Sequence, residues 1–324
     1  MRRRQPDRRD HTMDEHTSHP IPTDTTATHT REEMTFRSGD AACAATLYRP
    51  ATAAHSDLPC VVLAVGFSQT RRDGYPRFAE QFAQAGFAAL VFDYRHLGDS
   101  EGEPRQLIDF QRQRADLAAA ISFARTLDGI DPNRVAVWAF SFGGGHAVHE
   151  AARDDRLAAA ITLSPFVDGL AFTLTSDGSN SLRLIREAAH AALTRRPIRM
   201  PVFGPPGQLA VFTQPEARSG LEAVRAQDSL WRNEVLIKAS QPAVRIRPVR
   251  AAHRVRCPLL VGLGSHHTML PAGPMVRLAE RAPRGELRHY PGGHFDGFLD
   301  HFEEIADDHI EFLTRHLMAP HPAR

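Results

Sequence analysis

One serine in the chain stands in a setting that suits a catalytic nucleophile. Ser141 directly follows the apolar run RVAVWAF and is followed by Phe142 and a run of glycines. Small residues stand two positions before it, at Ala139, and two positions after it, at Gly143. A sharp strand-to-helix turn needs small residues there, because larger side chains would clash with the neighbouring backbone. Such a turn presents the serine Oγ at a helix N-terminus, where backbone N–H groups and the helix dipole favour a developing oxyanion.

Two other interpretations of the turn at Ser141 are open. An ordinary strand–glycine–helix turn would carry the serine by chance. A phosphate-binding loop also joins a strand to a helix, but neither GxGxxG nor GxxxxGK[ST] occurs in the sequence. The position of Ser141 between a predicted strand and a predicted helix favours the catalytic interpretation.

The segments around Ser141 alternate between strand and helix patterns. Strand patterns cover residues 60–67, 87–95, 134–141, 157–166, 257–264 and 286–292. Most of these are continuous apolar runs, which are typical of strands buried in a parallel sheet. Helical spacing of apolar residues predicts helices over residues 75–86, 107–126, 143–153, 275–282 and 302–317. Residues 34–50 alternate apolar and polar side chains, which predicts an antiparallel hairpin at a sheet edge. The predicted fold class is therefore α/β, a doubly wound and mostly parallel sheet.

The alternation divides the chain into three parts. Residues 1–33 are rich in Arg, Asp, His and Thr and nearly free of apolar residues, so we expect a disordered N-terminal tail and no signal peptide. Residues 34–168 and 254–324 carry the strand–helix alternation and form the predicted core. The alternation fails over residues 169–253, which we interpret as an inserted, mostly helical cap over the carboxyl edge of the sheet. We expect Phe172, Phe203, Phe212 and Trp231 of this basic cap to accept a partly apolar substrate.

The order and spacing of four strings resemble a known superfamily. The strings lie at residues 66–106, 138–147, 164–169 and 281–298, and the last reads RAPRGELRHYPGGHFDGF. From about residue 34 onward the chain is similar to the α/β-hydrolase superfamily, and within it to the serine-aminopeptidase and Xaa-Pro-dipeptidyl-peptidase-like branch of bacterial hydrolases. The resemblance implies that Ser141 is the nucleophile and His294 the catalytic base. It also implies that the N–H groups of Phe67 and Phe142 form the oxyanion hole.

The third member of the implied triad departs from the family pattern. The family places its acid in the turn after the strand predicted at residues 257–264. This turn reads GSHHTMLP at residues 264–271, and His267 stands where the aspartate is expected. Three possibilities stay open. In the first, Asp168, just after the strand predicted at residues 157–166, supplies a relocated acid. In the second, neutral His267 accepts the hydrogen bond from His294. In the third, the acid is lost. The acid's role is to orient the histidine and stabilise its protonated form.

Composition limits the partners that the chain is expected to have. The net charge of +1 gives no reason to expect nucleic acid as a partner, and no apolar run approaches the length of a membrane span. The three cysteines, Cys43, Cys60 and Cys257, are far apart, so a buried-thiol interpretation and a reducing cytoplasm are favoured. No cofactor or metal is expected, since metal-ligand spacing such as HExxH is absent.

The sequence thus predicts a bacterial, cytoplasmic serine hydrolase that cleaves a small-molecule ester, thioester or related acyl bond through an acyl-enzyme. The alternative is a protein of the same fold with a degenerate triad, acting as a non-hydrolytic biosynthetic cyclase or as a ligand-binding pseudo-enzyme.

Overall fold

The computed structural model describes residues 28–51, 57–175, 178–194, 197–238 and 240–318. The predicted tail therefore lies outside the described residues up to position 27. Its last part is structured, because the first strand begins at His29 and not at Met34.

The strands and helices follow one another in the predicted alternation. The strands are β1 His29–Ser38, β2 Ala41–Pro50, β3 Leu58–Ala64, β4 Ala88–Phe92, β5 Leu107–Ile108, β6 Ile130–Phe140, β7 Ala159–Leu163, β8 Ile198–Met200, β9 Val235–Ile237, β10 Leu259–Gly264 and β11 Gly285–Tyr290. The α-helices are α1 Tyr75–Gln84, α2 Phe110–Ala124, α3 Phe142–Ala151, α4 Gly169–Thr175, α5 Gly178–Thr194, α6 Pro215–Val224, α7 Ala272–Arg281 and α8 Phe302–Leu313. Short 3-10 or π turns cover η1 Ala243–Arg245, η2 Pro248–Arg254, η3 Asp296–Phe298 and η4 Thr314–Met318.

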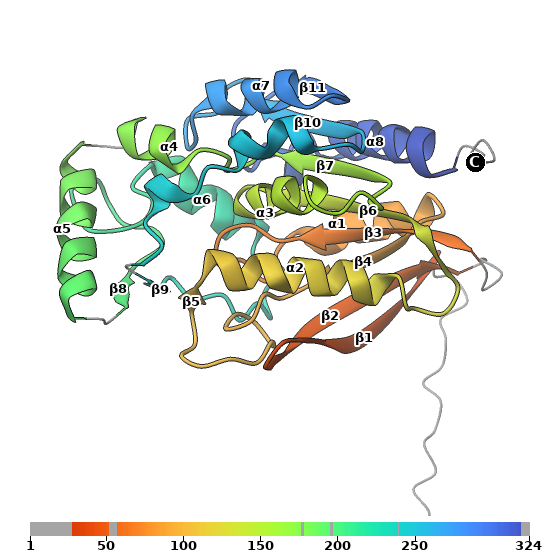
Figure 1. The fold of residues 1–324 in the computed structure, drawn as a ribbon, viewed down its shortest axis with the longest axis horizontal. Coiled ribbons are helices and arrows are strands. Elements are labelled where there is room, and N and C mark those ends of the chain that lie inside the picture. The colour runs from red at the N-terminus through yellow and green to blue at the C-terminus, as the bar shows by residue number, and fades with distance from the viewer. Residues whose placement is uncertain (1–27, 52–56, 176–177, 195–196, 239, 319–324) are drawn as a thin grey trace, which may run out of the picture.

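The main sheet has eight strands in the order β1-β2-β4-β3-β6-β7-β10-β11. The hairpin β1–β2 is antiparallel and lies at the edge, β2 is antiparallel to β4, and every later pairing is parallel. In Figure 1, α2 and α3 lie in front of the sheet, and α1 and α8 lie behind it. The predicted fold class is confirmed, and the predicted edge hairpin with it.

Burial of the central strands follows from their apolar composition. Every residue of β4, β7 and β10 is buried, which is expected for strands covered by helices on both faces. The three cysteines are free thiols in this core, as expected for buried cysteines. No helix within the described ranges is long and apolar enough to cross a bilayer.

The start of the long helix differs from the sequence prediction. Residues 107–126 were expected to be one helix, but Leu107–Ile108 form β5 and the helix begins at Phe110. Asp109 caps the helix, and its side chain accepts hydrogen bonds from Gln111 N and Arg112 N. An N-cap residue has extended backbone, so the two apolar residues before it are free to pair with another strand.

That other strand comes from the segment interpreted as a cap. A second sheet has the order β5-β9-β8, so β5 joins two strands that come from residues 169–253. The same segment carries α4, α5, α6, η1 and η2. In Figure 1 these elements gather at one end of the main sheet, the end at which α3 begins. The segment is thus a mixture of helices and a small sheet that is anchored to the core through β5.

Candidate active site

Ser141 lies at the junction of β6 and α3 in a strained backbone conformation. Its φ is 52° and its ψ is −117°, a region that non-glycine residues rarely adopt. Hydrogen bonds from Ser141 N to Leu163 O (3.0 Å) and from Phe166 N to Ser141 O (2.8 Å) hold this backbone in place. A Cβ on Gly143 would lie 2.5 Å from Val65 O, so only glycine fits two positions after the serine. The steric argument made from the sequence therefore applies to this turn.

Three side chains from distant parts of the sequence form a connected chain of hydrogen bonds. His294 Nε2 lies 3.0 Å from Ser141 Oγ, and His294 Nδ1 lies 2.7 Å from His267 Nε2. The remaining ring nitrogen, His267 Nδ1, lies 3.0 Å from Leu270 O. The structure thus brings Ser141, His294 and His267 together and ends the series on a backbone carbonyl.

With both rings neutral, one set of tautomers satisfies these three contacts. Leu270 O can only accept, so His267 carries its proton on Nδ1 and leaves Nε2 as an acceptor. His294 then donates its Nδ1–H to His267, and its bare Nε2 accepts the hydroxyl proton of Ser141. Leu270 N also lies 3.3 Å from His267 Nδ1, but a nitrogen that carries the proton does not accept, and the shorter contact to the carbonyl decides the assignment. In these tautomers His294 is ready to take a proton from the serine.

The two histidine loops are tied to one another by their main chains. Ser265 N donates to Tyr290 O (2.8 Å), and His266 N donates to Gly292 O (2.9 Å). These bonds continue the pairing of β10 with β11 beyond the ends of the strands. The loop after β10 therefore holds His267 beside the loop after β11, which carries His294.

Burial makes the neutral forms of both rings strongly favoured. His294 is buried, and burial followed by the neighbouring His267 lowers its pKa well below the ordinary value of a histidine. Half-buried His267 has its pKa lowered to about 4 by burial, although the hydrogen bond to Leu270 opposes the shift. No carboxylate of the described residues forms a hydrogen bond with either ring. The pair is therefore uncharged at neutral pH.

Asp168 is placed away from this chain of hydrogen bonds. Its carboxylate accepts two hydrogen bonds from Arg247, at 3.0 and 2.9 Å, and caps α4 by accepting from Leu170 N and Ala171 N. Burial alone would raise the pKa of Asp168, but the hydrogen bonds from Arg247 and the helix N-terminus lower it. The carboxylate that the sequence offered as a relocated acid is thus occupied by an arginine, and no contact with His294 is found in the described structure.

We predict that Asp168→Asn lowers stability and leaves turnover close to wild type. Removing the charge of buried Asp168 weakens its hydrogen bonds to half-buried Arg247, and hydrogen bonds to charged groups are worth about 1.5–3 kcal/mol. Chemical denaturation measures the stability change, and initial rates on an ester measure turnover. Asp128→Asn, at an exposed loop position, is the matched control. A loss of turnover on the order of 10³–10⁴ would instead assign Asp168 to the triad.

The loop that carries Phe67 is held against the start of α3. Tyr75 Oη accepts from Gly66 N (2.7 Å) and donates to Gln69 Oε1 (2.6 Å), which fixes the backbone around Phe67. Phe142 is the first residue of α3, and the first N–H groups of a helix have no acceptor within it. The two rings meet edge to face with centroids 5.2 Å apart. Both residues border the cavity at Ser141.

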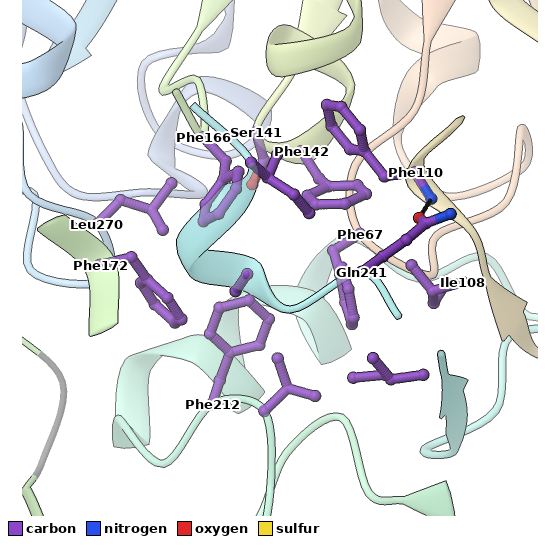
Figure 2. Close-up of a pocket in the computed structure, with 14 residues that line it drawn as sticks. Phe67, Ile108, Phe110, Ser141, Phe142, Phe166, Phe172, Phe212, Gln241 and Leu270 are labelled. Atoms are coloured by element: carbon purple, nitrogen blue, oxygen red, sulfur yellow. Dashed lines mark hydrogen bonds between the residues drawn. The ribbon is translucent and has the colours of Figure 1, made fainter. Parts of the chain in front are cut away.

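A largely apolar cavity opens in front of Ser141 (Figure 2). Its empty space is about 650 Å³, a volume that includes the open mouth. Core residues Phe110 and Phe166 and the predicted cap residues Phe172 and Phe212 line it. Phe203 and Trp231 do not line it; Phe203 stacks on Phe212 at 5.7 Å, and Trp231 packs against Phe203. The cavity thus combines core and cap side chains around the serine.

Sequence reasoning missed two residues at this site. Gln241 lines the cavity but is fully engaged, since its Oε1 accepts from Phe110 N (2.8 Å) and its Nε2 donates to Asp109 Oδ1 (2.7 Å). Leu270 acts through its main-chain carbonyl, which no side-chain pattern reveals. Only its place in the turn that ends at Pro271 was a signal in the sequence.

Other histidines and polar motifs near the site have structural roles. His146, on α3, is fully buried beside the ring of Phe110, as expected for a packed helix residue. Asp93 accepts hydrogen bonds from Arg71 N (2.7 Å) and Arg71 Nη1 (2.5 Å), and so ties the loop after β4 to the loop after β3. Within the described ranges, no group of three or more His, Cys, Asp or Glu side chains has the arrangement of a metal site.

Comparison with known proteins places this site in a family. Residues 58–301 match the family model described as serine aminopeptidase, S33. The quorum-quenching protein AidA of Acinetobacter baumannii (strain MDR-ZJ06) is 39% identical over 288 residues, which span 87% of this chain and 94% of AidA. The polyketide transferase grgF of a Penicillium species is 26% identical over 281 residues, which span 80% of this chain and 88% of that protein.

Solved structures agree on the fold. The crystal structure of the α/β hydrolase GrgF from Penicillium sp. sh18 has a TM-score of 0.76 at 22% identity and covers 89% of this chain and 99% of its own. The structure of DcsB in complex with its substrate analogue has a TM-score of 0.75 at 23% identity and covers 90% of this chain and 100% of its own. Since the family match spans well over half of the residues, the chain is an α/β-fold hydrolase that belongs to the serine aminopeptidase S33 family.

Proposed function

We propose that this hydrolase cleaves a small-molecule ester or thioester through an acyl-enzyme on Ser141. His294 is the general base, His267 orients it, and the N–H groups of Phe67 and Phe142 bind the oxyanion. The single observation that carries the proposal is the series of contacts from Ser141 Oγ to His294 Nε2 (3.0 Å) and from His294 Nδ1 to His267 Nε2 (2.7 Å). Residues 169–253 act as the cap of the acyl site in this proposal.

The reaction proceeds in two half-reactions. Ser141 Oγ attacks the carbonyl carbon while its proton passes to His294 Nε2, and the oxyanion forms beside Phe67 and Phe142. Collapse of the tetrahedral intermediate breaks the bond to the leaving group, which takes the proton from His294. Water then attacks the acyl-serine, again through His294, and releases the acid and the free serine.

The neutral partner of His294 narrows the range of acyl bonds. An aspartate in the usual position stabilises the imidazolium that forms during attack, whereas a neutral imidazole only accepts the hydrogen bond. Protonating His294 is therefore more costly here, and rates depend more strongly on how well the leaving group departs. Thiols have a pKa near 8.5, so a thiolate departs readily and a thioester suits this site better than an amide.

The cavity and the relatives support an apolar acyl group. Aromatic and aliphatic side chains line the space in front of Ser141, and such walls favour burial of a hydrocarbon chain. One relative is named a polyketide transferase, which fits an extended acyl chain in the same place. Another is named for quorum quenching, which is compatible with a small-molecule substrate.

The proposal is tested with an activity probe and a substrate panel. We expect a fluorophosphonate to label the wild-type protein and a His294→Ala variant to lose most of that labelling, because the probe needs an activated serine. Among acyl compounds with one common chain, we expect rates in the order thioester, aryl ester, then amide.

The panel also separates the alternatives. Labelling without release of free acid would indicate transfer or cyclisation by the acyl-enzyme in place of hydrolysis. Absence of labelling and of turnover on every compound would leave a ligand-binding protein of the same fold and overturn the proposal.

A further inference from the structure

A second cavity, rich in arginine, lies next to the one at Ser141. Its empty space is about 1020 Å³, including its open mouth. The cations on its wall come from α2, η1, η2 and the residues between η1 and η2: they are Arg114, Arg245, Arg247, Arg250 and Arg254. We call it the arginine cavity. No Asp or Glu is among the described residues that line it.

The positive charge of the arginine cavity is only partly balanced. Arg247 pairs with Asp168 at 2.9 Å, and Arg114 lies 3.5 Å from Glu150. Arg245, Arg250 and Arg254 form no ion pair with the carboxylates that the structure describes. Gathering these cations in one concave space is unfavourable unless an anion or solvent screens them.

A histidine on the same wall responds to this charge. His149, on α3, lines the arginine cavity. Burial, and then the charges of Arg114 and Arg254, lower the pKa of His149 to about 4. The ring is therefore neutral, in agreement with a local field that disfavours further positive charge.

The arginine cavity shares a wall with the acyl cavity. Phe110, Gln241 and Ile246 line both spaces. Ile246 lies between Arg245 and Arg247, which border only the arginine cavity. Residues 245–247 therefore lie between an apolar compartment that contains the nucleophile and a cationic one. Figure 2 shows Phe110 and Gln241 on the same side of the acyl cavity.

We infer that the substrate joins an apolar acyl group to a phosphate-bearing leaving group, and that the arginine cavity binds the phosphate. This inference rests on the proposed function and names the leaving group of that same site. Guanidinium groups bind phosphate oxygens through paired, charge-assisted hydrogen bonds, and several unpaired arginines in one space suit a polyanion. A phosphorylated thiol also meets the need for a good leaving group: the bond from acyl carbon to sulfur breaks, and the thiol takes its proton from His294.

Three thioesters with one acyl chain test this inference: hexanoyl-pantetheine, hexanoyl-phosphopantetheine and hexanoyl-coenzyme A. They share the reacting bond and differ in phosphate content. We expect the wild-type protein to prefer one or both of the phosphorylated thioesters, mainly through a lower KM. If phosphopantetheine suffices, the phosphate next to the pantetheine is bound; if only coenzyme A is preferred, the nucleotide phosphates are bound.

A variant in which Arg245, Arg250 and Arg254 are all replaced by Gln should lose that preference. The ratio of kcat/KM for the phosphorylated over the unphosphorylated thioester is expected to fall on the order of 10–100-fold, the effect of losing one or two hydrogen bonds to a charged group. Arg277→Gln, at an exposed arginine of α7 outside the arginine cavity, is the control and should leave the ratio unchanged.

Outcomes for the inference and for the proposed function are distinguishable. If an aryl ester is hydrolysed but the wild type shows no preference for phosphate, or the triple variant keeps the wild-type ratio, the inference is wrong and the proposed function stands. If no acyl compound is hydrolysed, the proposed function fails. Calorimetric titration with inorganic pyrophosphate then shows whether the arginine cavity binds an anion. Binding that the triple variant loses supports an anion site, and equal heats in both proteins overturn it.

Discussion

Ser141→Ala is expected to abolish fluorophosphonate labelling and to reduce acyl hydrolysis by on the order of 10⁶, the size of effect seen when a serine hydrolase loses its nucleophile. The physical reason is that no other oxygen in the described structure is shown in hydrogen-bond contact with His294 Nε2. Mass spectrometry of the labelled protein and initial rates on an aryl ester measure the two effects.

The fold should survive this substitution. Alanine keeps the Cβ, and the main-chain bonds from Ser141 N to Leu163 O and from Phe166 N to Ser141 O do not involve the hydroxyl. Ser164→Ala is a matched control, because Ser164 is also buried, has a φ of 47° and directly follows the neighbouring strand β7. The control should be labelled like the wild type. Labelling of the Ser141→Ala protein on another residue would show that the nucleophile lies elsewhere.

His267→Asp is expected to raise ester turnover, by less than the factor of about 10⁴ that a wrong histidine tautomer costs in the serine-protease template, because His267 already holds His294 in the working tautomer. Aspartate would accept the Nδ1–H of His294 in place of the neutral ring and would stabilise the imidazolium by its charge. Because an aspartate is shorter than a histidine, His267→Glu should be measured beside it as the variant with the longer reach.

The same substitution is expected to shift the pH profile upward. A general base works in its neutral form, so activity is lost as the pH falls through the pKa of the base. In the wild type, burial lowers the pKa of His294 well below its usual range and that of His267 to about 4. Activity should therefore persist below pH ~6.5, the ordinary histidine value. A carboxylate at position 267 raises the pKa of His294, so the acidic limb of His267→Asp should lie at higher pH.

His267→Ala separates orientation from charge. This variant removes the hydrogen-bond acceptor and the link to Leu270, so its turnover should fall below wild type. Equal turnover in the wild type, His267→Ala and His267→Asp, with unchanged acidic limbs, would contradict the role given to His267. The coupled titration of two facing rings makes the full pH profile more informative than a rate at one pH.

Much of the fold and the sharp turn at Ser141 could be predicted from local sequence patterns. The buried strands on either side of Ser141 are continuous apolar runs, and burial on both faces of a parallel sheet requires such runs whatever the rest of the chain does. The turn at Ser141 depends on steric limits within a few residues, with Ala139 before it and Gly143 against Val65 O. Local rules of burial and sterics act over short stretches, which is why a single sequence reveals them.

The partner of His294 was decided only by the tertiary structure. Asp168 and His267 both follow strands that end at the same edge of the sheet, so sequence position alone does not choose between them. In the folded chain Arg247, which lies 79 residues beyond Asp168, occupies that carboxylate, while main-chain bonds between the loops after β10 and β11 bring His267 to His294. The strand at Leu107–Ile108 and the arginine cavity likewise depend on where residues 235–254 return to the core. Such contacts join residues far apart in the chain, and their energies depend on which donors and acceptors the fold brings within hydrogen-bond distance, which no short sequence pattern encodes.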